Sequence, residues 1–571
     1  MRSRKSFLRV MLMRHSVIGV RFVPEALHDT QPNDAGCMPG TRTAVLSRFM
    51  TWAKDDPMRI FWLAGLAGTG KTSIAVTLCR YLQDEPAVLF GGAFFCSRSA
   101  NMDERTDARF ILPTLAVSLA EKSPLCASVL MQELNTDSRA AVKPIPDQLD
   151  SLFQRSLLTL ASSDRPIVFV IDALDECKDE TEVKRLLKAI ADFTSHAKVK
   201  FILTSRPETH INTSPIATLA HNAILRLHTI DSSEVAADIR LYMENSFSQE
   251  PLVESWYSEE DVQALTSRAD GLFIFASTII RYILDTGSPD ARKNRIRKVL
   301  STISSAVAMG TLDTMYEFVL TQASNASRVE PEELEVTRQV LACILTARMP
   351  LSVAALADLL GSQPIELRES LRRITAVVHV PLQSDQPELR TLHTSFGDYL
   401  FHRAGKSLMI TASLGNNFLA RGCLQVMRNR LHFNVSQSCS SYEPNPQAKS
   451  GKITLSLEYA CLHWVHHVAT AADPLRRDED ISKIIQPRFL FWLEVLSVLG
   501  QTWRAASILF FAASIVRAIT FVKYAFSHAF FRSSFQNFQC FYSTLTRSSY
   551  RHARSSSGVH PTSICRPFLL R

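Results

Sequence analysis

The pattern of hydrophobic and polar residues changes character along the chain. Between residues 59 and 228, short apolar runs alternate with longer stretches of helical spacing, which is typical of β–α–β units. Several of these runs are apolar almost without interruption, as strands covered on both faces must be. The predicted strands are residues 59–66, 88–96, 166–172, 199–205 and 223–228. The pattern therefore predicts an α/β domain built on a doubly wound parallel sheet.

Beyond the predicted sheet, the spacing of apolar residues becomes helical. Helices are predicted in residues 230–311 and again in residues 404–516. Between these regions, residues 312–403 combine helical patterns with two short β-like runs, 377–382 and 389–392, separated by a turn-rich segment. Helices followed by one hairpin indicate a winged-helix-like domain. The sequence shows no repeat of fixed period, which argues against a solenoid or a propeller within this chain.

The composition is that of a folded protein with unusual ends. Of 571 residues, 46% are hydrophobic and 21% are charged, which excludes collagen, coiled-coil and wholly disordered proteins. Most of the excess positive charge lies at the ends: residues 1–24 hold six Arg and Lys and residues 495–571 hold nine, with no acidic residue in either. The body is mildly acidic, so a basic groove for nucleic acid is not supported. We interpret residues 1–36 as a basic extension and residues 517–571 as a disordered tail.

The cysteines and the apolar segments bear on the compartment. Eleven cysteines are scattered without a C-x-x-C pair, which favours buried, reduced thiols. The N-terminal apolar segments are interrupted by arginines and lack a cleavage site, so we predict no secretory signal. An Arg-rich start without acids also fits a mitochondrial presequence, although a basic arm is the simpler interpretation. The apolar run 505–516 is too short to span a bilayer. We therefore expect an intracellular, cytoplasmic protein without a transmembrane segment.

Residues 65–72 carry the most specific motif of the chain. Their sequence, Gly-Leu-Ala-Gly-Thr-Gly-Lys-Thr, fits G-x-x-x-x-G-K-[ST], follows a predicted strand and opens a predicted helix. In such a loop, backbone N–H groups and the helix N-terminus surround a phosphate because glycine leaves room for it. Lys71 would neutralise the β- and γ-phosphate oxygens, and the Thr72 hydroxyl would ligate Mg²⁺. The predicted nucleotide-binding residues of this loop are Gly65, Gly68, Thr69, Gly70, Lys71 and Thr72.

An acidic element follows the third predicted strand. Asp172 ends that apolar run and is the natural Mg²⁺ ligand, directly or through water. Asp175 and Glu176 lie just past the strand end, where either could orient or deprotonate an attacking water. Arg206 directly follows the next predicted strand and could sense the γ-phosphate, because parallel strands end at one crevice. The alternatives are an acidic loop that only solvates a strand end and an arginine exposed at the surface.

These three elements, in this order, resemble the NACHT group of signal-transduction NTPases, in particular the large fungal family related to heterokaryon-incompatibility proteins and to nephrocystin-3. A small residue after the metal-binding Asp marks that group, and residues 172–176 (Asp-Ala-Leu-Asp-Glu) match it. Residues 204–208 look like the sensor strand of the family. The resemblance implies a P-loop NTPase domain of the STAND class followed by helical and winged-helix domains.

The resemblance also extends outside the sheet. Residues 37–42 are similar to a segment that precedes the phosphate loop in relatives, which implies adenine-side contacts for Thr41 and Arg42; a capped helix start is the alternative. Phe273 stands where many relatives have a proline against the base, which leaves ATP versus GTP open. Residues 392–396 look like the Met-His-Asp motif, which implies that His393 touches the β-phosphate of bound nucleotide. A histidine satisfied within the core is the alternative there.

We therefore predict a nucleotide-operated switch that binds Mg²⁺ with ATP, or GTP, and hydrolyses the nucleotide slowly. The resemblance implies protein partners or self-association on activation, whereas nucleic acid is not expected as a partner. The alternative is a non-catalytic scaffold that retains nucleotide for stability, or a truncated family member, acting through protein–protein contacts. Relatives commonly carry an effector domain before this module and a repeat sensor after it, so we expect a truncated member or an imperfect gene model. The predicted domains are 1–36, 37–229 (NTPase core), 230–311, 312–403, 404–516 and 517–571.

Overall fold

The computed structural model divides the chain into two compact units, Met1–Arg504 and Ala505–Arg571, and every residue of the candidate site lies in the first. The residues that the structure describes are 22–30, 36–98, 103–160, 165–195, 198–219, 224–249, 256–303, 310–323, 331–381, 383, 389–405, 408–437, 453–471 and 477–515. Most of the predicted basic extension and the whole predicted tail lie outside these residues.

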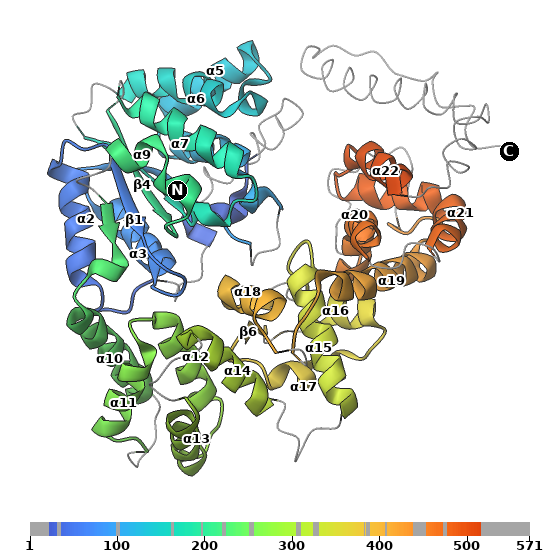
Figure 1. The fold of residues 1–571 in the computed structure, drawn as a ribbon. Helices are drawn as coiled ribbons and strands as arrows, with labels where there is room; N and C mark the ends of the chain where they lie inside the picture. The colour runs from blue at the N-terminus through green and yellow to red at the C-terminus, as the bar shows by residue number, and fades with distance from the viewer. Residues whose placement is uncertain are drawn as a thin grey trace. The chain divides into compact units, whose positions relative to one another are not determined.

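A five-stranded parallel sheet forms the centre of residues 37–229, the predicted NTPase core (Figure 1). Its strands follow the order β2-β3-β4-β1-β5, so that β4 lies between β1 and β3. The strands are β1 (Ile60–Ala64), β2 (Leu89–Phe95), β3 (Ile167–Asp172), β4 (Val199–Ser205) and β5 (Ile224–Arg226). Each predicted strand is present, with ends that differ by at most two residues. The predicted doubly wound fold is confirmed, and its parallel strands bring their carboxyl ends to one edge.

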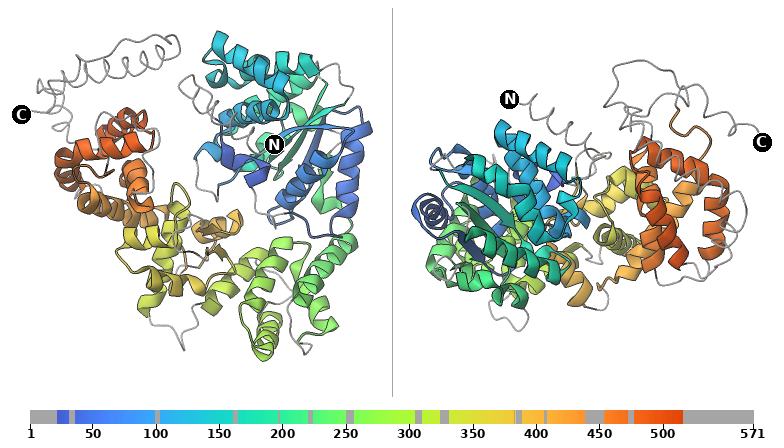
Figure 2. Two further views of the ribbon diagram at one scale, coloured as in Figure 1. Left: turned by 180° about the vertical axis from the view of Figure 1, so that it is seen from behind. Right: turned by 90° about the horizontal axis from the view of Figure 1, so that it is seen from above.

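Helices cover both faces of the sheet, as Figure 2 shows from two further directions. Successive strand residues face opposite cores: Phe169 and Phe201 belong to one apolar cluster, and Val168 and Ile202 to the other. The helices of the first cluster are α4 (Ile111–Lys122), α5 (Pro124–Thr136), α6 (Ile145–Leu160) and α7 (Glu180–Thr194), and those of the second are α2 (Thr43–Asp55) and α3 (Lys71–Asp84). Both faces are therefore buried, which explains the uninterrupted apolar strands.

The rest of the described chain is mostly helical. After the short helices α8 (Thr209–Asn212) and α9 (Pro215–Leu219), a helical segment holds α10 (Ser232–Ser248), α11 (Glu259–Ala269), α12 (Phe273–Leu284) and α13 (Pro289–Thr302). Ser258 and Asp261 form a reciprocal capping box that starts α11. The C-terminal helices are α19 (Ala412–Arg430), α20 (Leu455–Thr470), α21 (Arg477–Val498) and α22 (Arg504–Ile515). Within the described residues, no helix is long and apolar enough to cross a membrane.

Residues 311–403, which we call the hairpin segment, contain the predicted pair of strands. The antiparallel strands β6 (Val378–His379) and β7 (Arg390–Thr391) are shorter than the predicted runs. Most of the turn predicted between them, residues 384–388, lies outside the described residues. The helices of the segment are α14 (Thr311–Ala323), α15 (Pro331–Thr346), α16 (Val353–Leu360), α17 (Pro364–Arg372) and α18 (Thr394–His402). Only two residues, Leu392 and His393, separate the end of β7 from the start of α18, so the hairpin lies close to where that helix starts.

Candidate functional site

The loop between β1 and α3 has a backbone that requires glycine. Gly68 and Gly70 adopt left-handed conformations, with φ of +78° and +90°. A Cβ on Gly68 would overlap the Ile274 side chain of α12, so that position has no room for a larger residue. The Gly65 N–H donates to the Ser205 carbonyl at 3.1 Å, which ties the start of the loop to β4. The glycines therefore give the predicted phosphate loop the backbone conformation that a phosphate-binding loop needs.

Lys71 begins α3 and folds back over this loop. Its Nζ donates to the carbonyl oxygens of Gly65 at 2.8 Å and of Leu66 at 2.9 Å. Burial lowers the pKa of Lys71, whereas the carboxylates of Asp175 and Asp172 act in the opposite direction. The ammonium and these carboxylates thus belong to one electrostatic cluster at the carboxyl edge of the sheet.

Asp172 ends β3 and is almost completely buried, with 1% of its surface exposed. Its Oδ1 accepts a hydrogen bond from the Thr204 hydroxyl at 2.5 Å, while its Oδ2 has no hydrogen-bond partner among the described residues. Burial raises the pKa of Asp172, and the hydroxyls of Thr204 and Thr72 lower it. A buried carboxylate oxygen without a donor is costly. Because Mg²⁺ prefers oxygen ligands, this oxygen together with the Thr72 hydroxyl fits a magnesium ion.

The chain turns sharply after Asp172. Ala173 has a left-handed backbone with φ of +56°, and its N–H donates to the Thr204 hydroxyl at 2.9 Å. A short 3₁₀ helix, Leu174–Glu176, follows and is closed by a bond from the Glu176 N–H to the Ala173 carbonyl at 2.9 Å. Bulky and β-branched side chains are strained in this conformation. The turn therefore explains why a small residue follows Asp172.

The Glu176 carboxylate is held from two directions. Its Oε2 accepts the backbone N–H of Arg98 at 2.7 Å, and its Oε1 accepts the Thr394 hydroxyl at 3.2 Å. Burial raises the pKa of Glu176 to about 7. The hydrogen bond from the Arg98 N–H acts in the opposite direction and lowers this pKa. A carboxylate with a pKa near neutrality can both accept and release a proton at physiological pH.

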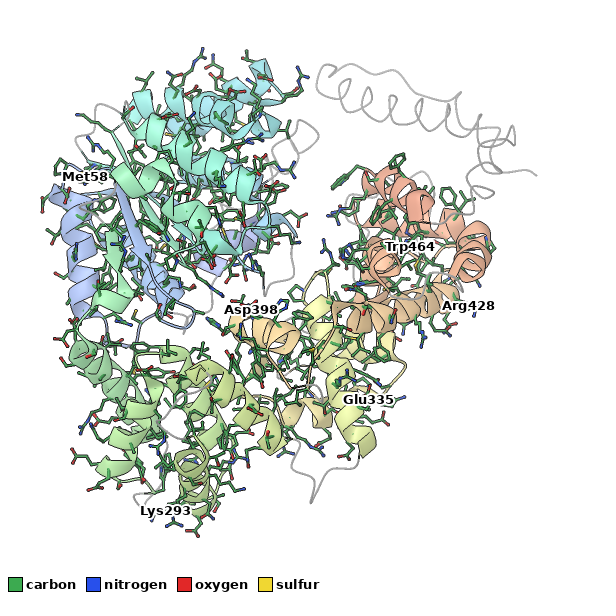
Figure 3. All side chains as sticks on the ribbon, viewed as in Figure 1. Met58, Lys293, Glu335, Asp398, Arg428 and Trp464 are labelled. Carbon is green, nitrogen blue, oxygen red and sulfur yellow. The ribbon has the colours of Figure 1, made fainter. Side chains whose placement is uncertain are left out.

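Arg206 links α18 to the acidic turn, as we call the 3₁₀ helix Leu174–Glu176. Its backbone N–H donates to Asp175 Oδ1 at 2.9 Å, and its Nε lies 3.1 Å from Asp175 Oδ2. The same guanidinium lies 3.4 Å from Asp398 Oδ2 and 3.5 Å from the Thr394 hydroxyl, and Figure 3 labels Asp398 on α18. Arg206 is therefore not the free surface arginine of the alternative interpretation.

His393 immediately precedes α18 and caps it. Its Nδ1 accepts the Ser395 N–H at 3.1 Å and lies 2.7 Å from the Ser395 hydroxyl, which in turn lies 2.8 Å from the buried Tyr316 hydroxyl. Burial lowers the pKa of His393 to about 3, and the charges of Arg206 and Lys71 act in the same direction. His393 is thus neutral, and because Nδ1 accepts a hydrogen bond, the proton is on Nε2.

The two predicted base-side residues differ in what they contact. The Thr41 hydroxyl donates to the Met38 carbonyl at 2.7 Å and closes its own turn. Arg42 is buried, donates from Nη2 to the Thr69 carbonyl at 3.0 Å, and lies 4.8 Å from the centroid of the Phe273 ring. Arg42 also precedes α2 as its N-cap residue without a side-chain capping bond. Of the pair, only Arg42 reaches the phosphate loop.

Sequence reasoning missed four residues that contact the site: Arg98, Ile274, Thr394 and Asp398. The Ile274 N–H donates to the Gly68 carbonyl at 3.1 Å, so α12 contacts the phosphate loop as well. Thr394 follows His393 in the matched motif and Asp398 lies one helical turn later, which is a signal that could have indicated both. For Arg98, the only signal was its place just after the second predicted strand.

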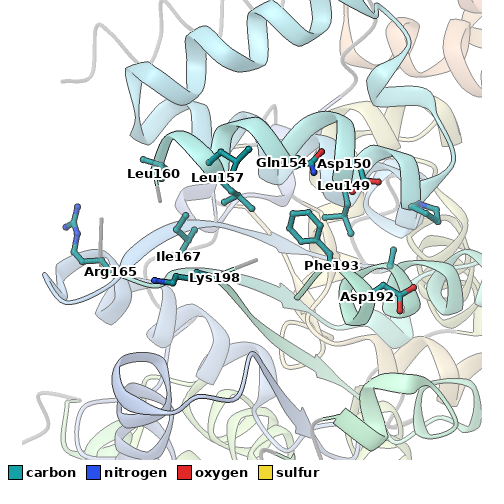
Figure 4. Close-up of a pocket in the computed structure, with 13 residues that line it drawn as sticks. Leu149, Asp150, Gln154, Leu157, Leu160, Arg165, Ile167, Asp192, Phe193 and Lys198 are labelled. Carbon is teal, nitrogen blue, oxygen red and sulfur yellow. The ribbon is translucent and has the colours of Figure 1, made fainter. Parts of the chain in front are cut away.

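A separate cavity of about 670 Å³ lies near the beginning of β3 and is lined by residues of α6 and α7 (Figure 4). Its walls include Leu149, Leu157 and Phe193, and Ile167 of β3 also lines it. No predicted site residue lines this cavity. The candidate nucleotide site is therefore the cluster at the carboxyl ends of the strands.

Comparison with known proteins agrees with this geometry. Residues 40–206 match the family described as Nephrocystin 3, N-terminal. The vegetative incompatibility protein HET-E-1 of Podospora anserina is 23% identical over 525 residues, which cover 84% of this chain. The predicted relationship to the fungal NACHT-domain proteins is confirmed. The chain spans only 36% of the length of HET-E-1, so the similarity concerns about a third of that protein.

Two solved structures are similar at low TM-scores. Cdc6p from Pyrobaculum aerophilum has a TM-score of 0.29 and 14% identity, covering 71% of this chain and 97% of that one. The Orc1 protein of Aeropyrum pernix, solved in complex with DNA, has a TM-score of 0.31 and 15% identity, covering 68% and 94%. These TM-scores are too low to identify the fold. The α/β fold is identified instead from the strand order of this chain and from the backbone of its glycine-rich loop.

Proposed function

We propose that this chain is a nucleotide-operated switch of the STAND class that binds ATP, or GTP, with Mg²⁺ and hydrolyses it slowly. The observation that carries the proposal is the gathering of Lys71, Asp172, Glu176 and His393 into one cluster, in which two protein segments meet. Such a cluster is expected where a triphosphate must be held, cleaved and sensed.

In this proposal the phosphate loop and Lys71 hold the triphosphate. Backbone N–H groups of the glycine-rich loop beyond Gly65 and the N-terminus of α3 would face the phosphates, and Lys71 would exchange its two carbonyl partners for phosphate oxygens. The Thr72 hydroxyl and Oδ2 of Asp172 would hold Mg²⁺. When bound, Mg²⁺ neutralises charge on the phosphate oxygens. Arg42 and Phe273 would lie on the base side, with ATP or GTP as the ligand.

Glu176 would act as the general base. Only its ionised form can take a proton from the attacking water, and its pKa of about 7 leaves much of it ionised at physiological pH. Asp175 orients Arg206, whose guanidinium would turn toward the γ-phosphate when it leaves Asp398.

The switch would act through α18. Thr394 contacts Glu176, and Asp398 contacts Arg206, so docking of α18 and exposure of the catalytic groups are linked. His393 would donate from Nε2 to a β-phosphate oxygen and favour the docked form. A nucleotide shifts such an equilibrium only by binding the two forms with different affinity. Self-association or binding of protein partners after undocking is part of this proposal.

The experiment compares ATP and GTP turnover of the full chain with turnover by Lys71→Ala and Glu176→Gln. The switch predicts slow, Mg²⁺-dependent hydrolysis by the wild type, loss of nucleotide binding in Lys71→Ala, and retained binding without hydrolysis in Glu176→Gln. If the wild type binds nucleotide but its turnover equals that of Glu176→Gln, the hydrolysis part is wrong and the chain is a nucleotide-stabilised scaffold.

A further inference from the structure

Arg98 lies beside the acidic turn because of the register of two strands. Phe95 of β2 pairs with Asp172 of β3, and the Cys96 N–H donates to the Asp172 carbonyl at 3.1 Å. The chain that leaves β2 therefore runs next to the chain that leaves β3. Three residues beyond Phe95, Arg98 reaches the 3₁₀ turn that carries Asp175 and Glu176.

Arg98 makes three hydrogen bonds to that turn. Its backbone N–H donates to Glu176 Oε2 at 2.7 Å. Its guanidinium donates from Nη2 to the Asp175 carbonyl at 2.6 Å and from Nε to the Glu176 carbonyl at 3.2 Å. Carbonyl groups at the end of a short helix lack partners within the helix, so the guanidinium acts as its cap. One residue thus holds both the carboxylate and the backbone from which it extends.

We infer that Arg98 is a positioning residue for Glu176, which it aims at the attacking water. The inference rests on the proposed function, because it assigns Arg98 a role in the reaction of that same site. The backbone N–H fixes one carboxylate oxygen, and the guanidinium fixes the turn. Effective general-base catalysis needs the reacting atoms within a fraction of an ångström of the productive geometry. Losing the guanidinium frees the turn while the backbone bond can persist.

Two other roles for Arg98 predict different behaviour. If its guanidinium bound a phosphate, removing it would weaken nucleotide binding. If it only braced the fold, removing it would lower thermal stability, with hydrolysis falling only as far as folded protein is lost. Positioning predicts a lower rate at saturating nucleotide, with unchanged affinity and unchanged unfolding temperature.

The experiment uses the full chain with Arg98→Ala, Arg98→Lys and the control Arg109→Ala. Arg109 is also exposed and also makes short contacts, to Asp107 at 2.9 and 2.6 Å, but it does not contact the acidic turn. Single-turnover hydrolysis of Mg-ATP, calorimetric affinity for ADP and thermal unfolding are measured for each. For Arg98→Ala we expect the rate to fall about 10- to 100-fold with the affinity within about twofold of wild type. Arg98→Lys should recover part of the rate, because an ammonium can still donate to one carbonyl.

Several results would overturn the inference. A rate for Arg98→Ala within twofold of wild type does so, as does an ADP affinity weakened tenfold or more, which would assign the guanidinium to a phosphate. If Arg98→Ala fails to fold, Arg98→Lys decides: a folded lysine variant with wild-type rate excludes the positioning role, and a reduced rate at wild-type affinity supports it. A wild-type rate that does not depend on Glu176 would refute the hydrolysis part of the proposed function and, with it, this role of Arg98.

Discussion

The contact between Thr394 and Glu176 allows the switch to be tested by a small change. Thr394→Val removes one hydroxyl while keeping the shape of the side chain, and Asp398→Asn removes the charge that faces Arg206. If docking of α18 restrains the catalytic carboxylate, both substitutions favour the undocked form. We expect each to raise the rate of hydrolysis, because Oε1 of Glu176 is then free to accept a proton from water.

The size of the effect follows from the geometry. A hydrogen bond to a charged group contributes about 1.5–3 kcal/mol, and at 3.2 Å in a half-buried place we take about 1 kcal/mol for Thr394. The pair of Arg206 and Asp398, at 3.4 Å with 27% and 34% of the side chains exposed, contributes about 0.5 kcal/mol. Together these contacts favour docking by roughly tenfold, since 1.4 kcal/mol corresponds to a factor of about ten. Thr394→Val alone should raise the rate about fivefold, and the double variant about tenfold.

The assay is steady-state phosphate release from saturating Mg-ATP. Thr337→Val is the matched control, because its hydroxyl bonds the Glu333 carbonyl on α15, away from the site. The control should match the wild type. A rate for Thr394→Val that equals the wild type within experimental error, or lies below it, would refute the reasoning that α18 restrains Glu176.

Three further predictions concern the same cluster. The pKa of Glu176 is about 7, and only the ionised carboxylate can act as the base. The hydrolysis rate should therefore rise about tenfold per pH unit below pH 7 and level off above pH 7. A flat pH–rate profile between about pH 5.5 and 8 contradicts this prediction. Gly68→Ala places a Cβ at φ +78°, which costs about 1–2 kcal/mol, and this Cβ overlaps Ile274. Nucleotide affinity should therefore fall at least about tenfold and recover partly in the double variant Gly68→Ala with Ile274→Ala. If calorimetry shows strictly additive effects of the two substitutions on affinity, the contact between these residues is contradicted. With a pKa of about 3, His393 is neutral throughout the physiological range. The ratio between the ADP affinity of the wild type and that of His393→Gln should therefore not change between about pH 5.5 and 8. A step in that ratio near about pH 6.5 would show that the histidine titrates and would contradict this prediction.

The parts of the site that the sequence predicts well are those made by contiguous residues. The phosphate loop has its glycines, its lysine and its threonine within eight positions, so neighbouring residues determine its geometry. Asp172 is similarly marked by the apolar strand that it ends, because a strand buried on both faces needs such a run. The small residue at 173 entered only through resemblance, and its physical reason is the left-handed backbone there.

The contacts that could not be predicted join residues far apart in the chain. Thr394 lies 218 residues from Glu176, and Arg98 lies 78 residues from it, so only the docking of α18 and the register of β2 and β3 bring them together. Thr41 and Arg42, which the resemblance paired as base-side residues, make different contacts for a local reason. The two are neighbours, but the Thr41 hydroxyl closes a turn while Arg42 extends to the phosphate loop.

The central claim is that Lys71 and Asp172 act on one magnesium-bound triphosphate, and isothermal titration calorimetry of the full chain tests it most directly. ATP and GTP are titrated with Mg²⁺ and with EDTA into the wild type, Lys71→Ala and Asp172→Asn. We predict binding by the wild type that is at least about tenfold weaker in EDTA, loss of about tenfold or more in Lys71→Ala, and an affinity in Asp172→Asn that no longer depends on Mg²⁺. The claim is contradicted if neither nucleotide gives heat with the wild type, or if all three proteins bind alike.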